Sequence, residues 1–435
     1  MTGDAGRKKI GLKRGISQLG FSAIALNGTI GAGIFALPAY AVGRAGYFSP
    51  WIYLFCGLLI MLIVLVFARV ASFFRDTGGP TTYVTRAFGP WAGFQVGWLL
   101  TLSRATAFAA NAHLMVTYAG WFWDPLTDGA WHTAGVLLVC VGLTLINAAG
   151  LKQGMIAVFA FTLLKLVPLI GLVLLGIHRT SPEIFSGANI PPLDSLGETA
   201  LVMFYAFVGF ETAVVPAGEA RRPRRDIPHA LVKTIFSITV FYFLVQVVTV
   251  SVSPGIDSSN TPLADVALVL MGGIGAAALT LGAVFSISGN LTSSMLSAPR
   301  MIYAMAHLGS LPGWFGEVSD RSQTPANAIL AYGGLATLLA LSGGFVWLAA
   351  MSTVVRLLVY VSVIATLPRL QSLMGGGEGR FKLPGGMAIP ALAFVLSLWL
   401  LTHAPMKSWL FTAVFILAGA VVYHFVRTPA RMKDD

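Results

Sequence analysis

Charged residues are scarce in this sequence: Asp, Glu, Lys and Arg make up 10% of 435 residues, whereas soluble domains carry about 25%. Hydrophobic residues make up 56%. They form runs of about 20 residues, the length that a helix needs to cross a hydrocarbon core of about 30 Å. An ordinary soluble domain is therefore excluded, and the chain is predicted to be an all-α integral membrane protein.

Cysteine is almost absent, and both residues, Cys56 and Cys140, lie within apolar runs. A disulfide framework and a metal site are therefore not expected. The spans also lack paired carboxylates and His-rich motifs, so neither an enzyme nor a cofactor is expected. No cleavable signal is predicted, because the first apolar run is long enough to span the membrane.

Twelve apolar runs are predicted to be membrane spans, with boundaries uncertain by several residues. The third and eighth are long enough to tilt or to project beyond the bilayer. The predicted spans are 16–43, 50–73, 88–119, 131–149, 154–177, 197–219, 229–252, 265–305, 325–342, 345–367, 387–403 and 408–426.

Basic residues predict the orientation of these spans. Of the 28 Lys and Arg residues, only Arg44, Arg179 and Lys407 lie in segments on the side opposite the N-terminus. Both termini are therefore expected to be cytoplasmic, in a multi-pass protein of the plasma or inner membrane. The net charge of +11 follows this distribution and forms no single basic face, so nucleic acid is not an expected partner. The basic stretch 221–225 suits anionic membrane lipid.

The first span is interrupted by glycine. Gly28, Gly31 and Gly33 lie within six residues, and Pro38 follows. Glycine costs a helix interior about 1 kcal/mol relative to alanine, and unwound backbone in a membrane must face protein or a water-filled cavity. From this span alone, close packing of helices through small residues explains the glycines equally well.

The sixth span decides between these interpretations. Its stretch 204–211, FYAFVGFE, places Gly209 and Glu211 mid-span, with Pro216 downstream. Two interrupted spans, five spans apart, are typical of transporters built from inverted repeats, because an odd offset turns the second repeat upside down. Each break frees backbone N–H groups and C=O groups, which together suit both ends of a zwitterion.

Three motifs resemble those of the amino acid–polyamine–organocation transporter superfamily, and the resemblance covers roughly residues 15–370. It implies an amino acid permease, a secondary active transporter that works by alternating access. The motifs are 28–35, GTIGAGIF; 207–211, FVGFE, followed by Gly218-Glu219 and 222–228, RPRRDIP; and 298–304, APRMIYA, followed by 309–312, GSLP.

The resemblance also implies a five-plus-five inverted-repeat core with helices 1 and 6 interrupted, as a monomer or a homodimer. The expected organisation is a cytoplasmic N-terminal segment, 1–15; a first repeat, 16–177; an inverted second repeat, 197–367; two peripheral helices, 387–426; and a cytoplasmic tail, 427–435.

Substrate contacts follow from the same resemblance. Backbone N–H groups of the first break should bind the substrate carboxylate, and carbonyls of both breaks should receive its amino group. Tyr205 occupies the position of the aromatic residue that closes over the substrate. The N–H groups are those of Ile30, Gly31, Ala32 and Gly33, and the carbonyls are those of about Ala23 to Ala25, Phe204 and Phe207.

An ionisable residue in mid-membrane is costly and therefore indicates function. Lys165, in the fifth span, lies where by resemblance a lysine replaces a sodium ion and bridges the first and eighth helices. It argues against sodium coupling. It either exchanges a proton during the cycle or is a permanently charged pin on backbone carbonyls. Ser286 and Ser288 of the eighth span are predicted to contact it.

Three further charged residues are expected inside the spans. Glu211 is either a pH-responsive gate or a hydrogen-bonded brace for the unwound backbone. Arg104 either lines the substrate path, pairs with Glu211 or reaches a carbonyl, and in the first case an anionic cargo is expected. Arg356 is expected in an inner gate or a helix brace.

Neutral polar side chains within the spans are candidates for the side-chain pocket, although Ser and Thr in helices often bond to their own carbonyls. Asn290 is the best candidate, because its amide oxygen and nitrogen both need partners. His113 is interpreted as an interior histidine with satisfied hydrogen bonds. The other candidates are Asn111, Ser352 and Thr353.

The predicted function is sodium-independent, proton-coupled transport of an amino acid. Exchange of two amino acids, or of an amino acid and an amine, is the alternative. A channel or a transporter-like sensor is less well supported, since a sensor is expected to carry a soluble output domain.

Overall fold

The structure is a computed structural model, and it describes residues 17–74, 79–150, 155–186, 190–215, 217, 220–319, 322–375 and 381–431. Among these residues every regular element is a helix, as predicted. The predicted segment 1–15, Pro216, Gly218-Glu219 of the second motif and residues 432–435 of the predicted tail lie outside the described residues.

The α-helices coincide with the predicted spans, apart from one additional short helix, α4. In chain order they are α1 Gln18–Thr29, α2 Gly33–Ala45, α3 Ser49–Ala71, α4 Pro80–Phe88, α5 Pro90–Ala119, α6 Gly129–Ala148, α7 Met155–Gly176, α8 Leu193–Met203, α9 Pro223–Val252, α10 Pro262–His307, α11 Ala326–Leu341, α12 Phe345–Met374, α13 Ala388–Thr402 and α14 Met406–Arg431.

Short 3-10 helices connect several of these elements. They are η1 Gly46–Phe48, η2 Asp124–Leu126, η3 Ile177–Arg179, η4 Pro182–Phe185, η5 Phe204–Phe207, η6 Phe210–Val214, η8 Ile256–Ser258 and η9 Gly313–Gly316.

The described helices have the length and composition of membrane spans. Seven helical stretches are long and apolar enough to cross a bilayer, and α11 and α13 are shorter apolar helices. Such helices satisfy their own backbone hydrogen bonds, which a hydrocarbon environment requires.

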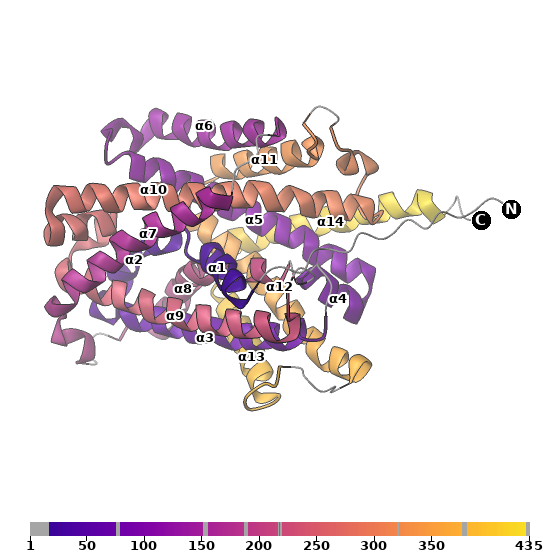
Figure 1. Ribbon diagram of the computed structural model, residues 1–435, viewed down its shortest axis with the longest axis horizontal. Coiled ribbons are helices and arrows are strands. Elements are labelled where there is room, and N and C mark those ends of the chain that lie inside the picture. The colour runs from indigo at the N-terminus through magenta and orange to yellow at the C-terminus, as the bar shows by residue number, and fades with distance from the viewer. Residues whose placement is uncertain are drawn as a thin grey trace.

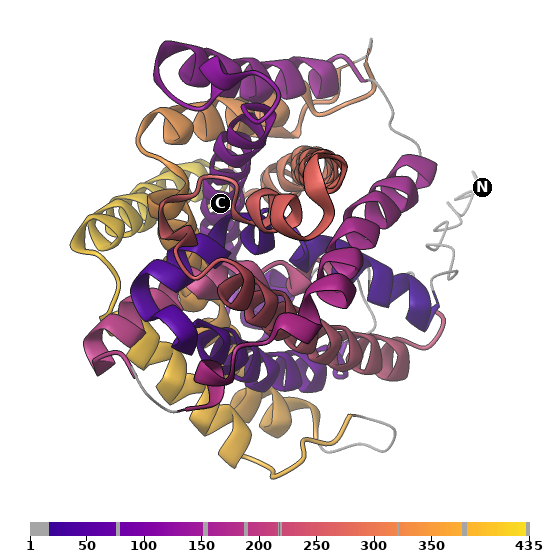
Figure 2. The ribbon, with the colours of Figure 1, turned by 90° about the vertical axis from the view of Figure 1, so that its left-hand side faces the viewer.

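The helices run roughly along the long axis of the molecule, with α1 near the centre (Figure 1). On one side α6 packs against α11, and on the opposite side α3 packs along α9 and against α13 (Figures 1 and 2). Between these sides, α5 contacts α10 and α12, and α1 contacts α9 and η6. The two interrupted spans therefore lie among helices that come from both halves of the chain.

Two features of the helices were not predicted. The helix α4 lies between the second and third spans, where Gly79 has a φ of 61° and Pro80 begins the first turn. The long helix α10 contains Gly272 with non-helical backbone (φ 68°, ψ −169°), which separates a first helical stretch from the eighth span proper. Both changes of direction occur at glycines with positive φ, which other residues rarely adopt.

Candidate functional site

The first span breaks between α1 and α2. Ile30 leaves the helical conformation (φ −77°, ψ 88°), and helix resumes at Gly33. Pro38 does not cause this break, because it lies inside α2. The prediction of an interrupted first helix is thus confirmed, with the interruption at residues 30–32.

The sixth span breaks at the second predicted position. Its α-helix α8 passes into the 3-10 helix η5, Val208 is extended (ψ 157°), and Gly209 has a φ of 112°. The chain then continues as η6, so the sixth helix is also interrupted, as predicted.

The two breaks touch each other through glycine. A Cβ atom on Gly28 would lie 2.6 Å from the carbonyl oxygen of Gly209, and one on Gly209 would lie 2.1 Å from that of Gly28. A Cβ atom on Gly33 would lie 2.6 Å from the Cα of Ala206. Each of these distances is too short for a side chain, so the backbones meet only because glycine stands there.

The first break offers fewer free N–H groups than predicted. Ile30 donates to Leu26 O at 2.8 Å and Gly31 to Thr29 O at 2.9 Å, because the last turn of α1 uses both groups. The N–H groups of Ala32 and Gly33 form no hydrogen bond with any described residue. They stand at the start of α2, where a helix N-terminus favours an anion.

The predicted carbonyls also need a correction. Ala23 to Ala25 lie inside α1, which continues to Thr29, so their carbonyls belong to regular helical turns. Phe204 begins η5, whose own 3-10 turn uses its carbonyl. The carbonyls of Phe207 and Val208 accept no backbone hydrogen bond from the described residues and lie at the second break.

A chain of polar side chains borders the breaks. The Tyr205 hydroxyl donates to Asn111 Oδ1 at 2.9 Å, and Asn111 Nδ2 donates to Asn290 Oδ1 at 2.8 Å. Asn290 Nδ2 in turn lies 3.1 Å from where a Cβ atom of Gly31 would stand. The structure therefore brings together Tyr205, Asn111, Asn290 and the first break. On its other side the Tyr205 ring packs edge-on against Phe345.

Lys165 reaches the first break from α7. Its ammonium donates to the carbonyl of Ile30 at 2.8 Å and to Asn27 Oδ1 at 2.9 Å, and the side chain is 3% exposed. The predicted contacts with Ser286 and Ser288 are wrong. Ser288 instead donates to Val284 O, and the buried Ser286 hydroxyl has no partner among the described residues. The free carbonyl at the break gives the ammonium a better acceptor than a hydroxyl.

Glu211 lies at the centre of a buried cluster of polar side chains next to the second break. It accepts the N–H of Gly209 at 3.0 Å and the hydroxyl of Tyr360 at 2.8 Å, and its other oxygen lies 3.0 Å from Arg356 Nη1. Arg356 Nε donates to Ser103 on α5 at 2.8 Å. Glu211 thus connects the unwound backbone with α12, the arrangement expected of a brace.

Arg104 is buried and does not pair with Glu211. Its Nη1 donates to Ser297 Oγ on α10 at 2.6 Å, and its Nε has no partner among the described residues. Arg104 and Asn111 are seven residues apart on α5, as are Asn290 and Ser297 on α10. The two side-chain contacts between these helices are therefore about 10 Å apart along the helix axes.

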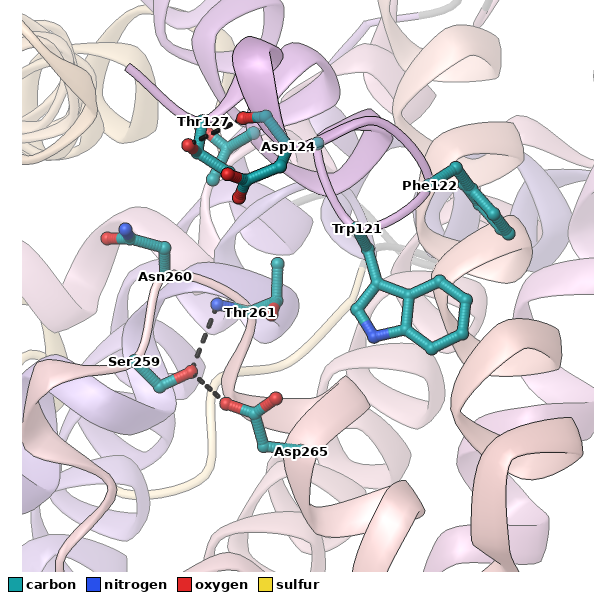
Figure 3. Close-up of a pocket in the computed structure, with 10 residues that line it drawn as sticks. Trp121, Phe122, Asp124, Thr127, Ser259, Asn260, Thr261 and Asp265 are labelled. Carbon is teal, nitrogen blue, oxygen red and sulfur yellow. Dashed lines mark hydrogen bonds between the residues drawn. The ribbon is translucent and has the colours of Figure 1, made fainter.

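A pocket of about 520 Å³ lies away from the breaks, where α5 ends and α10 begins (Figure 3). Trp121 and Asp124 line it together with Ser259 and Asp265, whose side chains hydrogen-bond to each other. None of the predicted site residues lines it. By the predicted orientation it opens on the external side.

Comparison with known proteins identifies the family of this chain. The model of the amino acid permease family matches residues 20–403. The chain belongs to the amino acid permease family. This permease therefore has the family's fold of about twelve membrane-spanning helices, the fold class predicted from its sequence.

Three relatives resemble the permease over most of their length. A probable GABA permease of Pseudomonas aeruginosa is 27% identical over 86% of this chain and 82% of its own. The serine/threonine exchanger of Bacillus subtilis is 25% identical over 95% of this chain and 97% of its own. The gamma-aminobutyric acid permease of Escherichia coli is 25% identical over 85% of this chain and 83% of its own.

Several residues of the permease's site were missed in the sequence. Asn27 was not among the predicted site residues, although an amide in a span indicates a buried partner. Tyr360 and Ser297 carried no signal, because Tyr and Ser are common in spans. Their charged partners, Glu211 and Arg104, could be predicted as site residues, because charged side chains are rare in membrane spans.

Proposed function

We propose that this protein carries an amino acid across the cytoplasmic membrane by alternating access, without sodium and with protons as the coupling ion. The observation that carries the proposal is the ammonium of Lys165 on the carbonyl of Ile30. A cation fixed at the freed carbonyl of the first break does the work of a bound sodium ion there. As an amine it can also release and take up a proton.

The free backbone groups supply a site for the zwitterion. In this proposal the N–H groups of Ala32 and Gly33 hold the carboxylate, and the carbonyls of Phe207 and Val208 receive the ammonium. Asn111 and Asn290 contact the substrate side chain, and Tyr205 closes over it. The relatives named for amino acid and GABA transport support a substrate of this class.

Exchange is the second candidate for the coupling. One relative is named as a serine/threonine exchanger and matches nearly the whole chain. An exchanger can have the same lysine and the same breaks, but it reorients only when substrate is bound.

The same proposal includes the arrangement in the membrane. Residues 16–177 and 197–367 form inverted repeats that rock around the breaks, with 387–426 peripheral. Both termini face the cytoplasm, and the basic stretch 221–225 lies against anionic lipid. The permease acts as a monomer or a homodimer.

Uptake by proteoliposomes tests the proposal. A panel of amino acids is offered under an inward pH gradient, under an inward sodium gradient, and with counter-substrate inside. Proton symport requires uptake that follows the pH gradient and is unchanged when potassium replaces sodium. Uptake only with internal amino acid would favour exchange. Dependence on the sodium gradient would contradict the assignment of Lys165.

A further inference from the structure

Two histidines join three helices on the face of α5 that points away from the breaks. His113 of α5 and His132 of α6 lie with Nδ1 and Nε2, respectively, 3.0 Å apart. The other ring nitrogen of His113 lies 2.8 Å from the carbonyl oxygen of Ala340 on α11. The other nitrogen of His132 lies 2.8 Å from that of Leu126 in η2. All four ring nitrogens are therefore engaged.

Counting protons shows what this arrangement requires. A carbonyl oxygen only accepts, so His113 must donate to Ala340 and His132 must donate to Leu126. A neutral imidazole has one N–H, and each ring uses its own in that bond. The nitrogens that face each other would then both carry lone pairs. A hydrogen bond between them at 3.0 Å needs one further proton.

We infer that His113 and His132 together form a binding site for a single proton, separate from Lys165. With the proton bound, the pair is singly positive and all three hydrogen bonds are made. Without it, two lone pairs face each other and one bond between α5 and α6 is lost. The proton therefore ties α5 to α6, whereas the bond from His113 to Ala340 O of α11 is made with or without it.

The surroundings hold few other groups that titrate. Asp124 and Asp128 precede α6 in the external loop, and Asp128 accepts the backbone N–H of His132 through its carbonyl. On α5 the nearest titratable side chain is Tyr118, which donates to Phe35 O. On α11 it is Tyr332, which is hydrogen-bonded to Ser294. Neither tyrosine carries charge near neutral pH, so Asp124 and Asp128 are the acidic residues that lie close to the pair in sequence.

The site matters because of what else α5 carries. Asn111, two residues before His113, belongs to the opposite face and to the polar chain at the breaks. The carbonyl of Ala107 lies 3.3 Å from the Tyr205 hydroxyl. Proton release from the histidine pair therefore loosens the helix that positions these groups.

Thermal unfolding of the purified full-length protein in detergent tests the inference without any transport assay. The informative variant is His132→Gln, because a glutamine amide nitrogen donates to His113 Nδ1 without an added proton. His132→Ala removes the contact altogether. His178→Gln makes the same exchange at an exposed histidine in η3 and serves as the control.

The wild type and His178→Gln are expected to lose about 1–3 °C more in Tm than His132→Gln as pH rises from 5 to 8. His132→Ala is expected to be less stable than the wild type at both pH values, because it also removes the bond to Leu126 O, and the difference should be larger at pH 5 than at pH 8. Equal pH dependence of the wild type and His132→Gln would overturn the inference. So would a loss of stability in His132→Ala that is the same at both pH values.

Discussion

At the scale of single residues, the glycines of the breaks differ in what surrounds them. Gly28 and Gly209 face each other's backbone, and backbone cannot move aside. The nearest atom to an added Cβ on Gly31 is the side-chain amide nitrogen of Asn290, at 3.1 Å. Gly31 is therefore the position where a side chain would enter the candidate site and leave the contact between the breaks intact.

Gly31→Val is expected to abolish amino acid uptake and to leave membrane insertion unchanged. The added methyl groups would occupy the space between the first break and Asn290. Uptake in proteoliposomes and the yield of folded protein in the membrane measure the two effects. The control is Gly142→Val on α6, where nothing lies within 4 Å of an added Cβ. Normal uptake by the Gly31 variant would refute the placement of the substrate.

Lys165→Ala is expected to remove the pH dependence of uptake, because no other cation contacts Ile30 O among the described residues. The measurement is the ratio of initial uptake rates at acid and neutral pH, which should fall to about 1. Lys233→Ala makes the same change at an exposed site on α9 and should keep the wild-type ratio. If the Lys165 variant kept that ratio too, coupling would belong to another group.

The chemistry of Lys165 was predictable from sequence, but its partners were not. A lysine in an apolar span needs polar acceptors, and that much follows from composition. Which acceptors it reaches depends on the rotation of α7 against α1 and α10. The free carbonyls at Ala23 to Ala25 were predicted from the family resemblance, and they lie about one turn before α1 ends at Thr29.

At the scale of elements, the sixth span depends on groups outside itself. The segment from Phe204 to Val214 contains no α-helix, so its backbone needs partners. Glu211 supplies one by accepting the N–H of Gly209, and α12 holds Glu211 through Arg356 and Tyr360. The unwound backbone is thus connected to α12 through the buried Glu211–Arg356 ion pair.

Glu211→Gln is expected to destabilise the protein by about 3–5 kcal/mol, because it leaves the Arg356 charge buried without a counter-charge. Arg356→Gln should cost a similar amount for the same reason. The double variant should cost clearly less than the sum, since it leaves no charge unpaired. Unfolding by denaturant measures the three values. Additive values would show that the two side chains act independently.

At the scale of the whole molecule, the fold was the most predictable property. A bilayer admits helices that satisfy their own backbone, so length and hydropathy located the spans. The helix α4 escaped prediction because it is short and only partly apolar. The hydrogen bonds between α5, α10 and α12 escaped because they join residues about 150 to 250 positions apart, for which one sequence holds no pairing signal.

The predicted orientation can be tested with cysteine labelling in intact cells. Cys56 and Cys140 are fully buried, which favours a silent background for a membrane-impermeant maleimide. Lys407→Cys, at an exposed position in the first turn of α14, is expected to react from outside. Arg300→Cys lies near the C-terminal end of α10, which faces the cytoplasm in the predicted orientation. It should therefore react only after permeabilisation. If the two variants reacted the other way round, the predicted orientation would be wrong and both termini would face the outside.

The polar chain beside the breaks has a direction. The Tyr205 hydroxyl has one proton and gives it to the oxygen of Asn111, whose nitrogen then gives to the oxygen of Asn290. Each amide is thereby turned the same way, and the chain ends on the Asn290 nitrogen, which faces Gly31. The position of the tyrosine thus sets which atom of Asn290 faces the first break: with the ring in place, the donor nitrogen.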